Sequence, residues 1–109
     1  MGDTGRWAHD LPMTTLHIDI NVNDLNTFRA GFADHAEIRH QAGVRAEHVR
    51  QAIDDPNHLL VQLDFDSVDR AEAFVGFLRE KIWKDSPVLV GTPQATILEP
   101  LDLATAAAS

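Results

Sequence analysis

The sequence contains no cysteine. This absence excludes disulfide bonds, cysteine nucleophiles and thiolate metal sites, because each of them needs a thiol. Positive charge is also scarce: 9 Lys and Arg stand against 17 Asp and Glu, so the formal net charge is −8 with His neutral. The positive residues are scattered along the chain. Nucleic acid and anionic membrane surfaces are therefore poor partners, since both attract clustered positive charge.

Long apolar runs are missing as well. No stretch is long enough to cross a bilayer, and the opening residues, MGDTGRWAHDLP, lack the apolar core of a signal peptide. We therefore expect a cytoplasmic protein. The chain has 109 residues, of which 44% are hydrophobic and 24% are charged, a balance typical of one folded domain. We expect this domain over residues 13–99, after an N-terminal leader or arm (1–12) and before a C-terminal tail (100–109).

Polar and apolar residues alternate along MTTLHIDINVND, residues 13–24. Successive side chains of a strand point to opposite faces, so this pattern predicts a strand with one apolar and one polar face. The apolar face carries Leu16, Ile18, Ile20 and Val22. The polar face carries Thr15, His17, Asp19 and Asn21.

Helical spacing follows this strand. Asp24 is a good N-cap, and Gly43 is a typical C-terminal stop, so we expect one helix between them. Its apolar stripe consists of Leu25, Phe28, Phe32 and Ala36.

A second helix is predicted after Asp66 or Ser67, either of which can cap it. Its apolar stripe consists of Val68, Ala71, Phe74, Val75, Leu78 and Ile82. Phe77 and Trp83 fall outside this stripe. They are interpreted as pocket lining, as dimer contacts, or as an extension of the core toward residues 88–90.

Three further strands are expected. Residues 44–52 are less regular, and a bulge near Glu47 and His48 would bring their apolar residues onto one face. The turn DDPN, residues 54–57, then predicts a hairpin with residues 58–65. That strand has an apolar face of Leu59, Val61, Leu63 and Phe65. Its other face carries Leu60, Gln62 and Asp64. A short last strand covers residues 94–99.

The order strand, helix, strand, strand, helix, strand predicts an α+β fold of the ferredoxin-like, split βαβ type. In this fold a four-stranded antiparallel sheet carries both helices on one face. The other face, which we call the open face, is left bare. It carries the polar residues of the first and third strands, His17, Asp19, Asn21, Gln62 and Asp64.

Three stretches resemble the dimeric α+β barrel superfamily of antibiotic biosynthesis monooxygenase-like proteins: HIDINVNDLNTFRAGFADHAEIR, IDDPNHLLVQLDFDSVDRAEAF and VLVGTPQATILE. The resemblance covers residues 13–99 and is specific to the fold, since many members have no established reaction. It implies a homodimer in which two protomers bring their open faces together as a barrel. It also implies a cavity for a small hydrophobic or aromatic molecule, between sheet and helices or inside the barrel.

The resemblance further implies an activity: cofactor-independent oxygenases hold and deprotonate a phenol-like substrate with a strand Asn, which corresponds to Asn21 here. Haem-degrading relatives use a Trp where this sequence has Phe77, and a haem-ligating His in the region of Ser86 and Pro87. The sequence also contains no Tyr. We therefore expect no haem and no other cofactor. The alternative is a non-catalytic dimeric binding or stress-related module.

The polar residues of the open face are the candidate catalytic groups. His17 is the candidate general base, because a neutral imidazole can take a phenolic proton, and Asp19 or Asp64 is its orienting acceptor. Asn21 is the fourth candidate catalytic group, and Gln62, in the same cluster, is a candidate substrate-binding residue. The simpler interpretation is a solvated or dimer-buried polar face without chemistry. A metal site of His17, Asp19, His48 and Asp64 is a further alternative, but the ligand spacing matches no known signature, so no metal is expected.

A second candidate site lies on the first predicted helix. His35 and Arg39 lie one turn apart, beside the phenylalanines of its apolar stripe, and could hold an anionic group of a ligand. Alternatively, His35 is a hydrogen-bonded edge residue and Arg39 extends along the helix end toward water. The expected apolar wall of the pocket consists of Phe28, Phe32, Phe74 and Phe77. His9, His40 and His58 are interpreted as solvated.

Overall fold

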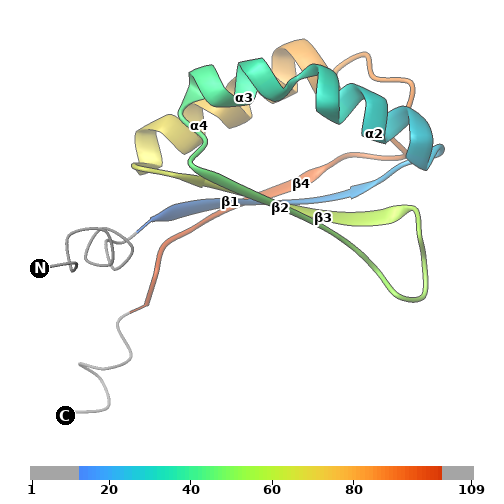
Figure 1. Cartoon of the computed structure of the whole chain (residues 1–109), viewed down its shortest axis with the longest axis horizontal. Coiled ribbons are helices and arrows are strands. Elements are labelled where there is room, and N and C mark those ends of the chain that lie inside the picture. The colour runs from blue at the N-terminus through green and yellow to red at the C-terminus, as the bar shows by residue number, and fades with distance from the viewer. Residues whose placement is uncertain (1–12, 102–109) are drawn as a thin grey trace, which may run out of the picture.

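The structure is a computed structural model that describes residues 13–101. In this part of the chain four antiparallel strands form one sheet in the order β2-β3-β1-β4. The strands are β1 (Thr14–Asn21), β2 (Ala46–Gln51), β3 (His58–Phe65) and β4 (Gln94–Leu98). The helices are α2 (Leu25–Asp34), α3 (Ala36–Ala42), α4 (Val68–Phe77) and the π-helical segment η1 (Leu78–Trp83). All helices cover one face of the sheet (Figure 1), which confirms the α+β, ferredoxin-like prediction.

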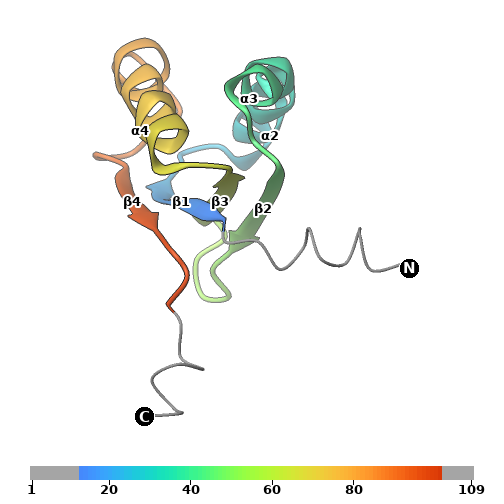
Figure 2. The same cartoon turned by 90° about the vertical axis from the view of Figure 1, so that its left-hand side faces the viewer.

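The expected leader, residues 1–12, and most of the expected tail, residues 102–109, lie outside the described residues, as does His9. Figure 2 shows the arrangement of the layers end-on: α2 and α3 lie above the β2 and β3 side, and α4 lies above the β4 side. Within residues 13–101, no helix combines the length and apolar character that a membrane span requires.

The core lies between the sheet and the helices. β1 and β3 alternate strictly between buried and half-exposed residues along most of their length, as their sequence pattern predicts. The two strands are paired from Thr14 opposite Phe65 to Asn21 opposite His58. The buried apolar residues are Leu16, Ile18, Ile20, Val22, Leu59, Val61, Leu63, Phe65, Ala71, Phe74 and Val75.

The predicted bulge in the second strand is wrong. β2 pairs with β3 in a continuous register from Ala46 opposite Asp64 to Gln51 opposite Leu59. Val44 precedes the strand and packs against the core from the connection after α3, so its side chain follows no strand alternation. Ile53 belongs to the turn and is fully exposed, at 104%. Four apolar residues suggested the bulge. Val44 and Ile53 lie outside the paired strand, and Ala46 and Val49 alternate regularly within it.

The first predicted helix is divided at His35 into α2 and α3. The backbone at His35 leaves the helical region, with φ −97° and ψ 13°. Its ring Nδ1 lies 2.6 Å from the carbonyl oxygen of Gly31, which also accepts the backbone N–H of His35. The carbonyl oxygen of Gly31 is thus contacted by both the ring and the backbone of His35 at the point where the helix breaks. The predicted stop at Gly43 is confirmed, because Gly43 has φ 98°.

The predicted N-cap of α2 is confirmed, and it leads to a stability prediction. Asp24 Oδ1 accepts hydrogen bonds from the backbone N–H groups of Asn26 and Thr27, at 3.0 and 3.3 Å. Asp24→Ala removes this cap and should lower the free energy of unfolding by about 1 kcal/mol in urea denaturation. Asp24→Asn keeps an accepting oxygen and is the control. Equal losses in both variants would show that the cap contributes little.

The second predicted helix changes its geometry half-way. Ser67 caps α4, with Oγ accepting the backbone N–H of Arg70 at 3.2 Å, while Asp66 instead pairs with Arg45 at 2.9 Å. After Phe77 the helix widens into η1, and a wider turn rotates the following side chains relative to an α-helical stripe. Trp83, which falls outside that stripe, is thereby turned against the core, and Phe77, the last residue of α4, packs against the core as well.

Candidate functional site

A cavity of about 160 Å³ lies between the sheet and the helices. Its floor consists of apolar residues from the helix-covered face of the two central strands, Ile18, Ile20, Val61 and Leu63. Its walls come from α2, α3, α4, η1 and the loop after η1. An engineered cavity of about 150 Å³ in another protein binds benzene, so this cavity has room for a molecule with one aromatic ring.

Aromatic side chains form opposite walls of the cavity. Phe28 and Phe32 of α2 stack with their ring centroids 5.6 Å apart, and Phe74 and Phe77 of α4 stack at 6.1 Å. Trp83 of η1 adds a fifth aromatic group to the lining. The structure therefore brings together the four phenylalanines that the sequence predicts as an apolar wall, and flat ring faces favour an aromatic ligand.

His35 is one of the few polar residues of the cavity lining. A carbonyl oxygen can only accept a hydrogen bond, so the short contact from Nδ1 to Gly31 requires the proton to be on Nδ1. In the neutral ring, Nε2 is then an acceptor with a free electron pair. His35 therefore brings a hydrogen-bond acceptor to the residues that line the cavity.

Arg39 also lines the cavity, and its side chain is almost fully buried, with the whole residue 6% exposed. Nε and Nη2 contact the two carboxylate oxygens of Glu47 at 2.7 and 3.2 Å. Nη1 donates to the carbonyl oxygen of Phe32 at 2.6 Å, and Cζ lies 3.6 Å from the centre of the Phe32 ring. The interpretation in which Arg39 extends along the helix end toward water is therefore wrong: the guanidinium points inward because β2 presents a carboxylate to it.

The polar residues of the open face form other pairs than the sequence suggests. Asp19 Oδ1 lies 2.7 Å from Nε2 of His58, the first residue of β3. His58 is half-buried, so its interpretation as a solvated turn residue is wrong. Thr15 donates to Asp64 at 2.6 Å. Both expected orienting carboxylates, Asp19 and Asp64, thus have partners other than His17.

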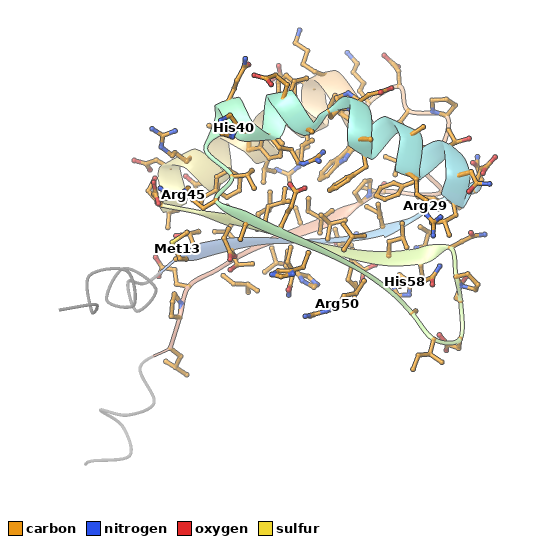
Figure 3. All side chains as sticks on the ribbon, viewed as in Figure 1. Met13, Arg29, His40, Arg45, Arg50 and His58 are labelled. Carbon is orange, nitrogen blue, oxygen red and sulfur yellow. The ribbon has the colours of Figure 1, made fainter. Side chains whose placement is uncertain are left out.

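His17 itself lies opposite Gln62 in the paired strands, with its Nδ1 3.4 Å from Nε2 of Gln62. His48 lies on the other side of Gln62, so the three side chains form a row across the open face. Arg50 is on the same face, one row further along, and Figure 3 shows Arg50 and His58 on the side of the sheet away from the helices.

The open face and the cavity lie on opposite sides of the sheet. Within β1 the cavity is lined by Ile18 and Ile20, whereas His17, Asp19 and Asn21 point the other way. A molecule in the cavity is therefore separated from these polar residues by the sheet of its own protomer. Among residues 13–101, three or more His, Cys, Asp or Glu side chains do not come together in a group that could hold a metal ion.

No protein-family model and no curated protein matches the chain. Solved structures do. A crystal structure described as "Putative antibiotic biosynthesis monooxygenase" from Bordetella bronchiseptica has a TM-score of 0.66 at 18% identity, over 84% of this chain and 99% of that one. A protein from Nitrosomonas europaea with the same description has a TM-score of 0.65 at 15% identity, over 83% and 91%. The chain has this antibiotic biosynthesis monooxygenase-like fold.

A "dimeric ferredoxin-like protein" from an uncultured marine organism is also similar in fold to this chain, with a TM-score of 0.53 at 11% identity, over 80% of this chain and 94% of that one. At these identities the likeness concerns the fold, and an activity has to be argued from the site. The resemblance noted in the sequence is thereby confirmed for the fold.

Sequence reasoning left the position of Trp83 open, and it missed Glu47, the partner of the cavity residue Arg39. Trp83 was left without a defined position, because the π-helical turn that rotates it inward has no clear signature in the sequence. Glu47 was overlooked because a bulge at this position would interrupt the alternation of side chains, so the face on which Glu47 lies could not be assigned. A signal for it was present: Glu47 and Val49 are two residues apart and so share the helix-covered face of a regular strand.

Proposed function

We propose that this protein binds a small, mainly apolar aromatic molecule in the cavity between the sheet and the helices. The observation that carries the proposal is the cavity itself, about 160 Å³ in volume, with stacked phenylalanines on opposite walls and His35 as an acceptor. An apolar pocket with few, well-oriented polar groups is the usual form of a small-molecule site.

A catalytic form of this proposal follows from the His35 ring. Nε2 takes the proton of a bound phenol, and the phenolate then supplies all four electrons that dioxygen accepts, so that no cofactor is needed. With 4-methylphenol, one oxygen atom converts the methyl group into an aldehyde, and the other leaves as water with two hydrogens of that methyl group. The alternative, a non-catalytic binding module, uses the same cavity. Dioxygen consumption in the presence of 4-methylphenol distinguishes them, because only the oxygenase consumes it above the rate without protein. A catalytic role stays a prediction for the polar residues of the open face, His17, Asp19, Asn21 and Asp64. It requires a second ligand-binding cavity, formed between the open faces of two protomers.

We also propose that two protomers associate through their open faces. Three apolar residues support this association. Leu60 of β3, half-buried, and Leu98 of β4, 42% exposed, lie on the open face, and Ile53 is fully exposed in the β2–β3 turn. Figure 1 shows this turn bending away from the helices, toward the side of the open face. Apolar residues interspersed with polar ones are typical of a dimer interface.

Thermal unfolding in the presence of 4-methylphenol tests ligand binding. A ligand at ten times its Kd stabilises the folded state by roughly 1.4 kcal/mol, which raises the Tm of a domain of this size by about 6–7 °C. We expect such a rise with 4-methylphenol and a smaller one with cyclohexanol, which lacks an aromatic face and an acidic hydroxyl. A Tm that no single-ring compound changes would contradict the proposal.

A further inference from the structure

The cavity contains a charged group whose charge is already compensated. Arg39 is buried in its lining, and both carboxylate oxygens of Glu47 are engaged by the guanidinium. The side chain of Glu47 is 40% exposed, so the carboxylate reaches solvent on one side while it holds the buried cation on the other. The ion pair therefore leaves no uncompensated charge at the point where Arg39 lines the cavity.

The pairing determines what an incoming ligand meets. An anion that enters the cavity loses its hydration and needs a positive partner in return. The fork of donors on Arg39 that would serve best is occupied by Glu47, and Nη1 is engaged by the carbonyl oxygen of Phe32. An anionic ligand must either displace Glu47 or stay uncompensated, whereas an uncharged ligand meets neither cost.

We propose that Glu47 makes the cavity selective for uncharged aromatic ligands over aromatic carboxylates, an inference that rests on the proposed ligand binding. Glu47 acts through Arg39 as a specificity-determining residue. Without its negative charge, the buried guanidinium becomes an anion-binding group at the end of an apolar pocket.

The experiment compares two ligands of nearly equal shape, 4-methylbenzamide, which is neutral, and 4-methylbenzoate, which is ionised near neutral pH. Their dissociation constants are measured by isothermal titration calorimetry with the full chain. For the unaltered protein we expect 4-methylbenzamide to bind at least about tenfold more tightly. In Glu47→Gln we expect 4-methylbenzoate to bind more tightly than it does to the unaltered protein. The preference for 4-methylbenzamide then falls by about tenfold or reverses.

Two variants are controls. Glu37→Gln makes the same change of charge on the exposed surface of α3, where Glu37 contacts Gln41, and should leave the ratio unchanged. Glu47→Asp keeps the negative charge and should keep the preference for the amide. It also tests the proposal if Glu47→Gln does not fold, because an Asp variant that prefers the carboxylate would overturn it.

Two outcomes overturn the inference alone: equal affinity of the unaltered protein for both ligands, or an unchanged ratio in Glu47→Gln. In each of these cases the cavity still binds aromatic molecules, and the proposed function stands. If neither ligand, nor 4-methylphenol, binds to the unaltered protein or to any variant, the proposed function itself fails, and the inference fails with it.

Discussion

Gly31→Leu is expected to abolish the binding of single-ring aromatic molecules. Gly31 lies in α2 and lines the cavity, and a Cβ at this position meets no heavy atom within 4 Å. The Cβ of a leucine therefore begins in open space at the cavity lining, and we expect the rest of the side chain to occupy the space that a ligand needs. We expect the Kd for 4-methylphenol to rise by roughly 100-fold or more, measured by calorimetry.

The same substitution should raise stability. Leucine has a higher helix propensity than glycine, by roughly 0.8 kcal/mol in a helix interior, and the added side chain fills empty space. Gly76→Leu is the matched control, because Gly76 also lies in a helix, is exposed, and has nothing within 4 Å of its Cβ position. Gly76→Leu should leave the Kd unchanged. Undiminished binding in Gly31→Leu would place the ligand somewhere else.

Leu60→Glu should convert the proposed dimer into monomers. Leu60 lies on the open face of β3, opposite Arg50 of β2 and Asp19 of β1 in the paired strands. Twofold symmetry brings the substitution into the interface twice, and each carboxylate loses its hydration there. We expect the dimer dissociation constant to rise by roughly 100-fold or more, measured by sedimentation equilibrium.

Ala73→Glu is the control for this change. Ala73 is exposed on α4, on the helix side of the sheet, so the same new charge should leave the association unchanged. Two results would contradict the proposed interface: an unaltered protein that sediments as a monomer, or a Leu60→Glu variant that associates as well as Ala73→Glu does. Neither result would affect ligand binding in the cavity, which lies within one protomer.

The sheet and its core could be predicted because local patterns determine them. β3 has the predicted bounds, since strict alternation allows a single choice of buried face. The caps Asp24 and Ser67 and the stop at Gly43 are also local signals, because each side chain or glycine acts on the adjacent turn. Phe28, Phe32 and Phe74 follow from helical spacing in the same way, whereas Phe77 lies outside the predicted stripe.

The polar parts of the site could not be predicted, since they depend on contacts between residues far apart in the sequence. His58 pairs with Asp19 across 39 residues, and this contact requires the exact register of β1 and β3. Arg39 is buried because Glu47, on the next strand, compensates its charge. From the sequence alone, an arginine near a helix end is more often solvated.

Trp83 offers the most direct measurement of the central claim, that the ligand lies between the sheet and the helices. The chain has 2 tryptophans, and Trp7→Phe leaves Trp83, which lines the cavity, as the single site for fluorinated tryptophan. We predict that 4-methylphenol shifts the fluorine NMR signal of Trp83 in a saturable way, and that Gly31→Leu abolishes this shift. A calorimetric binding signal without any change at Trp83 would contradict the account.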